Sequence, residues 1–514
     1  MKTIKIPICI CFLMLFFQFN AQIDGDNLFD SDQVVEIQLD FPQSDYWDQL
    51  VTNYENMDVA GSVYIPANLT IIDVTGTYTF DSVGIRLKGN SSYMHPGNKK
   101  SFKIDFNKYI SGQNYDGLKK LNFSNGFKDP TFMREKIFMD IAREHGVPAP
   151  RVNYASVTYN GQAWGFYTMV EQIDDQFLDW RMLNDDGNLF KAGSNFSGGD
   201  GEANLMYYGT SQASYESSYE LKSNEDANDW TDLIELIDFI NNSSDIEFET
   251  ELQNHLDLGP FLSSAALDNI FSNLDSYTQS ARNYYIYHNL GMGKWQWIKW
   301  DANEAFGSYG FFGGANPSTL NIDYHSENRP LLERIFSNSN LMDQYTSEVC
   351  LLMNTIFNPE YLNPIIDDLK ALIQDEVYAD NNKMFSNNDF DQNIENDLGG
   401  GGPGGPPGGP IQGLKSFVQE RYDYLTSVVD CEPFSSIHSL TDSDISIYPN
   451  PSDSYLLFKG INTYPASITI KDINGALILT EQIYSDSQAI DVSSMASQLY
   501  FVQVEGQVMK LFVP

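Results

Sequence analysis

The sequence predicts an α+β protein, with a large mixed domain followed by a small all-β domain. Strand-like runs dominate the first half of residues 32–430, and amphipathic helices dominate the second half. Short strands separated by turn residues fill 439–514. A chain of 514 residues has room for at least two domains with separate cores.

The first half of the large domain is predicted to be a sheet with one helix packed on it. Five runs are rich in residues that favour strands: 34–39, 84–88, 101–106, 152–159 and 165–170. An Asn160-Gly161 turn makes the last two a hairpin. The helix is expected to begin near Asp129 and Pro130, which suit a cap and a first turn, and to stop at Gly146.

The second half places two aspartates at the ends of predicted elements. A helix over 261–271 is apolar nearly all round, which predicts burial, and Asp275 follows it. Two aromatic strands come next, 284–288 and 295–300, and Asp301 follows the second directly. Protein kinases place their catalytic and magnesium-binding aspartates in this order. The first orients the acceptor hydroxyl and takes its proton, and the second holds Mg²⁺ against the phosphates.

Several short motifs occur in the same order as in a known family. They are Gly89-Asn90-Ser91-Ser92, KKSFKI at 99–104, VEQID at 170–174 with Phe177-Leu178, Asn283-Tyr284-Tyr285, and Trp300-Asp301 with Phe306-Gly307. Together they resemble the spore coat protein H (CotH) kinase family over about residues 34–421. The resemblance implies a two-lobed, atypical protein-kinase-like fold. It also implies transfer of the γ-phosphate of ATP to Ser or Thr with Mg²⁺ or Mn²⁺.

By this resemblance, three residues would surround the metal. Asp275 would be the catalytic aspartate and Asp301 the metal-binding aspartate. Asn283 would supply a second metal ligand. It lies eight residues after Asp275, further than in standard kinases, so a purely structural asparagine is the alternative.

Three further residues would bind the nucleotide. Lys103 would contact the α- and β-phosphates from a strand, and Glu135 on the capped helix would be its partner. Glu171, at a strand end, would lie near the nucleotide. The ordinary alternatives are an exposed strand lysine, a carboxylate favoured in a first helical turn, and a solvated strand end. No GxGxxG occurs in the first half, so the clamping of the phosphates is unexplained.

The tail carries a second resemblance. YPNP at 448–451, ITIKDING at 468–475, LYFVQV at 499–504 and Lys510 resemble the type A sorting domain of the type IX secretion system. This implies export across the outer membrane by that secretion machinery. The alternative is an ordinary carbohydrate-binding or spacer sandwich.

Residues 1–21 are predicted to be a secretory signal peptide. Lys2 and Lys5 precede a short apolar run, and Ala21 ends a plausible cleavage site. That run is too short to span a bilayer, and no later segment is long and apolar enough. We therefore expect an exported protein, secreted or at the cell surface, without a transmembrane segment.

The net charge limits the expected binding partners, and the cysteine content limits the possible disulfides. The chain has 70 acidic and 30 basic side chains and a formal net charge of −40. Such a charge repels phosphate backbones, so nucleic acid is not expected as a partner. Of the four cysteines, Cys350 and Cys431 lie outside the signal, where they form one disulfide or remain two thiols.

Two other functions remain open at this stage. A kinase-like fold without catalysis would serve adhesion, coat assembly, or carbohydrate or protein binding at the surface. A calcium-binding module built from the Asn/Asp-rich run 380–397, predicted to be a loop, is the weaker alternative because no EF-hand spacing occurs. The run 399–410, GGGGPGGPPGGP, is predicted to be a flexible insertion.

Overall fold

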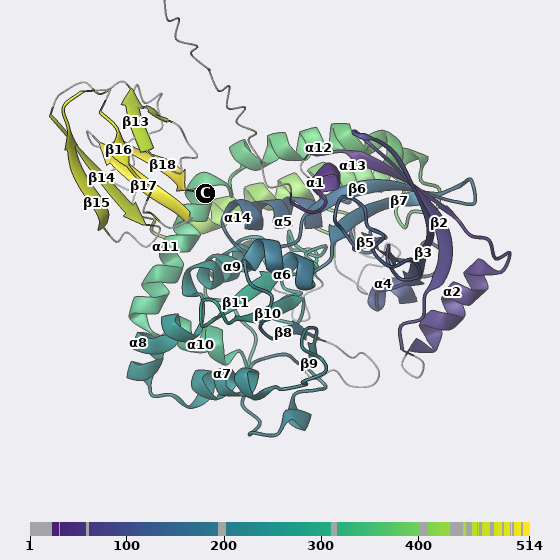
Figure 1. The fold of residues 1–514 in the computed structure, drawn as a ribbon, viewed down its shortest axis with the longest axis horizontal. Helices are drawn as coiled ribbons and strands as arrows, with labels where there is room; N and C mark the ends of the chain where they lie inside the picture. Colours follow the sequence, from purple (N-terminus) through teal and green to yellow (C-terminus); the bar gives the residue numbers. More distant parts are fainter. Residues whose placement is uncertain are drawn as a thin grey trace, which may run out of the picture. The chain divides into compact units, whose positions relative to one another are not determined.

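A computed structural model describes residues 23–29, 31–57, 61–193, 202–309, 316–399 and 410–431, and most of 446–513 with short gaps. The chain divides into two compact units, Met1–Val429 and Asp430–Pro514. The expected signal peptide and residues 400–409 of the Gly/Pro-rich run lie outside the described residues. The first unit is mixed α/β, as Figure 1 shows.

Seven strands of the first unit form a closed sheet in the order β1-β2-β3-β4-β5-β7-β6. All neighbours are antiparallel except β1 and β6, whose parallel pairing closes the sheet. The strands alternate buried and more exposed residues, so one face supplies the core. Their bounds are β1 Val34–Asp40, β2 Ile65–Asp73, β3 Gly76–Leu87, β4 Phe102–Asp105, β5 Lys120–Ser124, β6 Val152–Tyr159 and β7 Gln162–Glu171.

The helices of this half include the predicted one, which begins later than expected. Helix α5 starts at Arg134 rather than near Asp129, because Phe132 takes the left-handed conformation at φ 60°. The Asp129 carboxylate instead accepts the backbone N–H groups of Thr131 and Arg134. The helices are α1 Asp26–Phe29, α2 Tyr46–Glu55, α4 Ser91–Met94, α5 Arg134–Glu144 and α6 Asp175–Met182.

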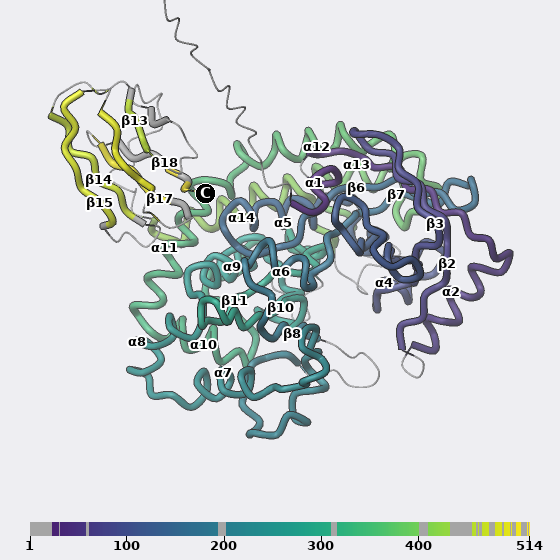
Figure 2. Tube along the Cα trace, viewed as in Figure 1, coloured from purple at the N-terminus to yellow at the C-terminus, as the bar shows by residue number. Residues whose placement is uncertain are grey.

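The second half of the unit is built on a four-stranded sheet in the order β11-β10-β8-β9. Its strands are β8 Leu189–Ala192, β9 Tyr219–Leu221, β10 Tyr284–Asn289 and β11 Lys294–Lys299. Figure 2 follows the chain from this sheet into the helices that come after it. The helices of this half are α7 Thr231–Asn242, α8 Asp245–His255, α9 Leu258–Ile270, α10 Pro330–Ser337, α11 Ser339–Thr355, α12 Pro359–Ala379, α13 Asn387–Glu395 and α14 Leu414–Val428, with 3₁₀ turns η1 Gln212–Ser214 and η2 Pro317–Thr319.

Helix α13 corrects the prediction that 380–397 is a loop. Ser386 and Asp389 form a reciprocal capping box at its start. Phe390 and Ile394, one turn apart, are both fully buried. The polar composition of the run concealed a helix that is fixed by one cap and one apolar pair.

The second unit contains only strands among its described elements. A three-stranded sheet, β12-β13-β16, and a four-stranded sheet, β15-β14-β17-β18, share one apolar core. The expected Asn474-Gly475 turn and most of the YPNP motif lie outside the described residues. The bounds are β12 Ser446–Tyr448, β13 Tyr455–Lys459, β14 Ala466–Asp472, β15 Leu477–Ile483, β16 Ile490–Asp491, β17 Gln498–Val504 and β18 Gln507–Val513.

The state of the two cysteines outside the signal, left open by the sequence, is answered directly. Cys350 and Cys431 are both disulfide-bonded, which excludes two free thiols. Among the helices that the structure describes, none combines the length and apolar character needed to cross a membrane.

A buried ion pair ties helix α12 to the closed sheet. The Lys99 Nζ lies 2.6 Å from Asp380 Oδ2, and both side chains are almost fully buried. Asp380, just after α12, also accepts the backbone N–H of Phe166 on β7 at 3.0 Å. Because the carboxylate is the counter-charge of a buried ammonium group, its loss leaves an uncompensated charge in the core.

We therefore expect Asp380→Asn to lower the free energy of unfolding by about 3 kcal/mol or more. Asp175→Asn is the control, since the exposed Asp175 carboxylate lies 3.9 Å from Lys119, and it should change stability by less than about 1 kcal/mol. Urea denaturation of both variants measures the difference. Equal effects would show that the Lys99–Asp380 pair does not hold α12 on the sheet.

Candidate functional site

A polar cavity of about 1260 Å³ lies in the first unit. Its lining comes from β3, β4, β5 and β7 of the closed sheet, from α5, from β8, β9 and β10, and from the segments after α9 and β11. Of the six residues predicted from the sequence to form the site, five line this cavity: Lys103, Glu135, Asp275, Asn283 and Asp301.

Asp275 and Asn283 are joined by hydrogen bonds at one end of the cavity. The Asn283 Nδ2 donates to both Oδ2 and the backbone oxygen of Asp275, at 2.9 Å each. Asn283 takes the left-handed conformation at φ 57°, and the loop that contains it returns the chain to Asp275 before β10 begins. The loop therefore brings Asn283 into contact with Asp275, although the two are eight residues apart in the sequence.

Asp301 follows β11 directly and also has a left-handed backbone, with φ 55°. Burial and the nearby Asp275 carboxylate raise the pKa of Asp301, and Lys88, Lys191 and Lys128 oppose that rise. The two aspartates thus lie close together at one end of the cavity, where the positive charge of the lysines favours the ionised form of Asp301.

A third carboxylate, Glu304, had no role assigned from the sequence. It is buried, and its side chain forms an ion pair with the Lys128 Nζ at 2.8 Å. Burial and the Asp275 carboxylate raise the pKa of Glu304 to about 8. Its position three residues after Asp301 was the available signal, but the fold had to supply the contact with Lys128.

The structure separates Lys103 from the carboxylates. Its Nζ donates to Gln172 Oε1 at 2.6 Å, and burial together with the cations of Arg86 and Lys120 lowers its pKa well below the usual range. Lys103 pairs in register with Arg86 and Asn122 on the neighbouring strands. The lysine expected to face Glu135 therefore contacts a glutamine.

Lys88 is the lysine that faces the acids. Its Nζ lies 3.3 Å from Asn122 Oδ1 and 5.4 Å from the centre of the Trp300 ring. Burial lowers the pKa of Lys88 to about 8, and Asp301 and Glu135 oppose that change. Burial and Asp301 raise the pKa of Glu135, and Lys88 counteracts them. The sequence signal was a lysine directly before Gly89.

Glu171 does not line the cavity. Its carboxylate pairs with the Arg151 side chain at 2.5 Å and accepts the Arg151 backbone N–H at 3.0 Å. Both side chains are buried, so this carboxylate has a structural partner at the end of β7. The expected contact of Glu171 with the nucleotide is thus replaced by an ion pair within the sheet.

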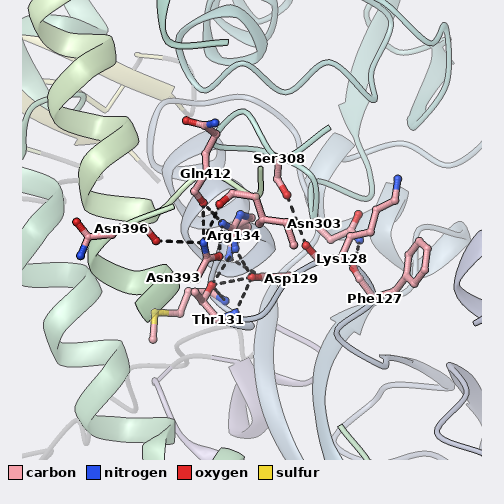
Figure 3. A network of polar contacts seen from close by, with 12 residues as sticks. Phe127, Lys128, Asp129, Thr131, Arg134, Asn303, Ser308, Asn393, Asn396 and Gln412 are labelled. Carbon is pink, nitrogen blue, oxygen red and sulfur yellow. Dashed lines mark hydrogen bonds and ion pairs between the residues drawn. The ribbon is translucent and has the colours of Figure 1, made fainter. Parts of the chain in front are cut away.

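A buried network holds the first turn of α5 beside the cavity (Figure 3). Arg134 is fully buried and pairs with Asp129 at 2.5 Å. The Arg134 Nη2 donates to Asn393 Oδ1 at 2.8 Å and to the Gln412 backbone oxygen at 2.5 Å. Because Asn393 lies on α13 and Gln412 precedes α14, the network connects helices distant in sequence to the residue before Glu135.

The same segment reaches the loop after β11. The Asn303 Nδ2 donates to the Phe127 backbone oxygen at 2.8 Å, as Figure 3 shows. The Lys128 Nζ contacts the Glu304 carboxylate. Residues 127–134 therefore contact the helical half of the unit through Arg134 and the loop after β11 through Phe127 and Lys128.

The residues present fit a magnesium ion carried by phosphates. In the described part of the chain, no three His, Cys, Asp or Glu side chains are placed to hold a metal by themselves. Mg²⁺ commonly takes only one or two protein carboxylates and completes its shell with water and phosphate oxygens. Asp301, with Asp275 and Asn283 beside it, provides such a partial set of oxygen ligands.

Comparison with known proteins assigns the family. Residues 85–425, more than half of the chain, match the family described as "CotH kinase protein". The chain belongs to this family. It is similar to the "Inner spore coat protein H" of Bacillus subtilis (strain 168), with 26% identity over 295 residues that cover 56% of this chain and 76% of that protein.

Residues 446–512 match a "Secretion system C-terminal sorting domain". The resemblance of the tail to a type IX sorting domain is confirmed by this match. Such a domain implies handling by the type IX secretion machinery and export to the cell surface or outside the cell.

The burial of Glu135 predicts a pH dependence of stability. Its folded-state pKa, about 8, lies above the ordinary value of 4.5, so the protonated form is favoured by folding. That contribution to stability is complete below pH 4.5 and is lost as the pH rises to 8. Glu135→Gln should abolish this part of the loss, on the order of 5 kcal/mol, so the variant becomes the more stable protein above pH 8.

Denaturation of the ligand-free protein at pH 5, 7 and 8.5 tests this expectation. Glu144→Gln, an exposed change at the other end of α5, is the control and should leave the pH profile unchanged. Parallel pH profiles for wild type and Glu135→Gln would contradict the assigned environment of Glu135.

Proposed function

We propose that this protein is an exported, atypical protein kinase. It transfers the γ-phosphate of ATP to Ser or Thr residues of surface or secreted proteins and requires Mg²⁺ or Mn²⁺. The observation that carries the proposal is the meeting of Asp275, Asn283, Asp301, Glu135 and Lys88 around one cavity. Membership of the CotH kinase protein family supports it.

In this proposal the first unit has two lobes. The closed sheet and α5 form one lobe, and the four-stranded sheet with its helices forms the other. ATP would lie in the cavity between the two sheets, with its phosphates toward Asp301. This division corresponds to the two-lobed arrangement expected from the sequence.

The chemistry assigns a separate task to each acidic residue. The Asp275 carboxylate would orient the acceptor hydroxyl and take its proton as the hydroxyl oxygen attacks the γ-phosphorus. The bond from the γ-phosphorus to the bridging oxygen then breaks, and ADP leaves. Asp301 and Asn283 would hold the cation that neutralises charge on the phosphate oxygens.

Lys88, rather than Lys103, is the lysine that we assign to the phosphates. Its ammonium group lies near Glu135 and Asp301, the carboxylates that a phosphate-bound cation would also approach. Lys103 is engaged by Gln172 and surrounded by other cations, which makes its charged form costly. The assignment moves the nucleotide-binding role from the sequence-predicted Lys103 on β4 to Lys88, which directly follows the adjacent strand β3.

Asp301→Ala should reduce phosphate transfer by at least about 100-fold, because the metal is central to the reaction. The assay is transfer from γ-labelled ATP by the mature protein to itself and to a generic protein substrate, with Mg²⁺ and with Mn²⁺. Asp368→Asn, an exposed change on α12, is the control and should keep full activity. If wild type transfers no phosphate with either metal, the non-catalytic surface protein is the better conclusion.

The choice between the two lysines is tested by Lys88→Met and Lys103→Met. Saturating ATP with Mg²⁺, at 100 times its Kd, should stabilise wild type by about 2.7 kcal/mol in thermal unfolding. Lys88→Met should lose most of this stabilisation, and Lys103→Met should keep most of it. The reverse result would return the phosphate contact to Lys103.

A further inference from the structure

Three cavity lysines have no ion-pair partner in the described parts of the chain: Lys88, Lys103 and Lys191. This is unusual in a protein with 70 acidic and 30 basic side chains, where a cation readily finds a carboxylate. Elsewhere in the same cavity, the Lys222 Nζ lies 2.9 Å from Glu220. Unpaired lysines in a confined space favour an anionic ligand.

Lys191 enters the cavity from the side opposite the closed sheet. It lies on β8, where it pairs in register with Tyr285 on β10 and with Glu220 on β9. It is half-buried, and burial lowers its pKa, while the carboxylates of Glu220 and then Asp301 oppose that change. The Asp301 carboxylate therefore interacts electrostatically with two lysines, Lys191 on the four-stranded sheet and Lys88 at the end of a strand of the closed sheet.

The segment Gly89-Asn90-Ser91-Ser92 is not arranged like a glycine-rich phosphate loop. The Tyr54 hydroxyl donates to the Gly89 backbone oxygen at 2.5 Å, and the Tyr54 ring stacks on Tyr93 at 3.6 Å. The next two amides, of Tyr93 and Met94, donate back to the Asn90 oxygen. These contacts fix the segment as a tight turn, with the Gly89 oxygen bound to Tyr54 and the two amides that follow the segment bound to Asn90.

We propose that Lys88 and Lys191 form a two-sided clamp for the polyphosphate of the ligand, in place of a glycine-rich loop. The clamp grips the phosphate chain from the closed sheet and from the four-stranded sheet, beside the cation at Asp301. Only the identification of that ligand as ATP rests on the proposed function. Lys191 is thereby a ligand-binding residue that the sequence motifs do not reveal.

The clamp requires that the phosphate chain itself binds without a nucleoside. Inorganic tripolyphosphate with Mg²⁺ is therefore the probe, titrated by calorimetry into the mature full-length protein. Wild type should bind it, and Lys88→Gln and Lys191→Gln should each weaken binding by at least about tenfold, because each loses one charge-assisted contact. Lys191→Arg keeps the charge and should restore affinity to within about threefold of wild type.

Lys222→Gln is the matched control, since it removes the same charge from the same cavity where the amine is already paired with Glu220. It should stay within about twofold of wild type. No binding to wild type, or equal weakening by Lys191→Gln and Lys222→Gln, would overturn the clamp. Tripolyphosphate binding with this pattern but no phosphate transfer would support the clamp and reject the kinase. Transfer with an unchanged KM for ATP in Lys191→Gln would support the kinase and reject the clamp.

Discussion

The arrangement of the cavity depends on the half-buried carboxylate of Asp301. Removing a carboxylate from water is costly unless positive charge lies close to it. Here Lys88 follows a strand of the closed sheet, Lys191 lies on the four-stranded sheet, and both act on this one group. The two sheets must therefore meet at Asp301, and the loop after β11 is the point that both halves of the unit share.

Four of the residues with a left-handed backbone belong to the segments around the same point. Lys128, Asn283, Asp301 and Phe306 all have φ between 55° and 60°, a conformation that costs free energy in residues with side chains. Three of the four are held by side-chain contacts: Lys128 by Glu304, Asn283 by Asp275, and Phe306 by ring contacts with Phe271 and Phe417. Such strain persists only where the surroundings fix it, and it places polar groups in the cavity that regular helices and strands would direct elsewhere.

The sequence was sufficient where a residue's position follows from its own element. Asp275 comes after an apolar helix and Asp301 after an aromatic strand, so local patterns placed both at element ends. The alternation of Phe102 and Ile104 in the core likewise sets Lys103 on the other face of β4. The hydrogen-bond partner of Lys103 is Gln172, however, and this contact depends on the register of the strands, which no local pattern specifies.

The same limit explains the residues that sequence reasoning missed. Lys88 and Lys191 are 103 positions apart, and only the meeting of the two sheets brings them to one carboxylate. Glu171 is an acidic residue at a strand end, as a site residue could be. Its charge is instead balanced by Arg151, which directly precedes the neighbouring strand β6. Charge pairing is a tertiary property, so which acid is neutralised within the protein and which remains for a ligand follows from the fold.

The overall charge of −40 opposes the binding of an anion, so the cavity must supply local positive charge. At a distance, so acidic a surface repels a polyphosphate, but at physiological ionic strength that repulsion is screened beyond about 8 Å. Inside the cavity the dielectric is lower and screening is weaker, so a few unpaired lysines outweigh the distant acidic groups. Affinity for an anion must therefore come from those lysines and a bound cation. Because the lysines belong to both sheets, this affinity depends on the relative position of the two halves of the unit. The Arg134 network joins these halves through Asn393, Gln412 and the residues beside Lys128.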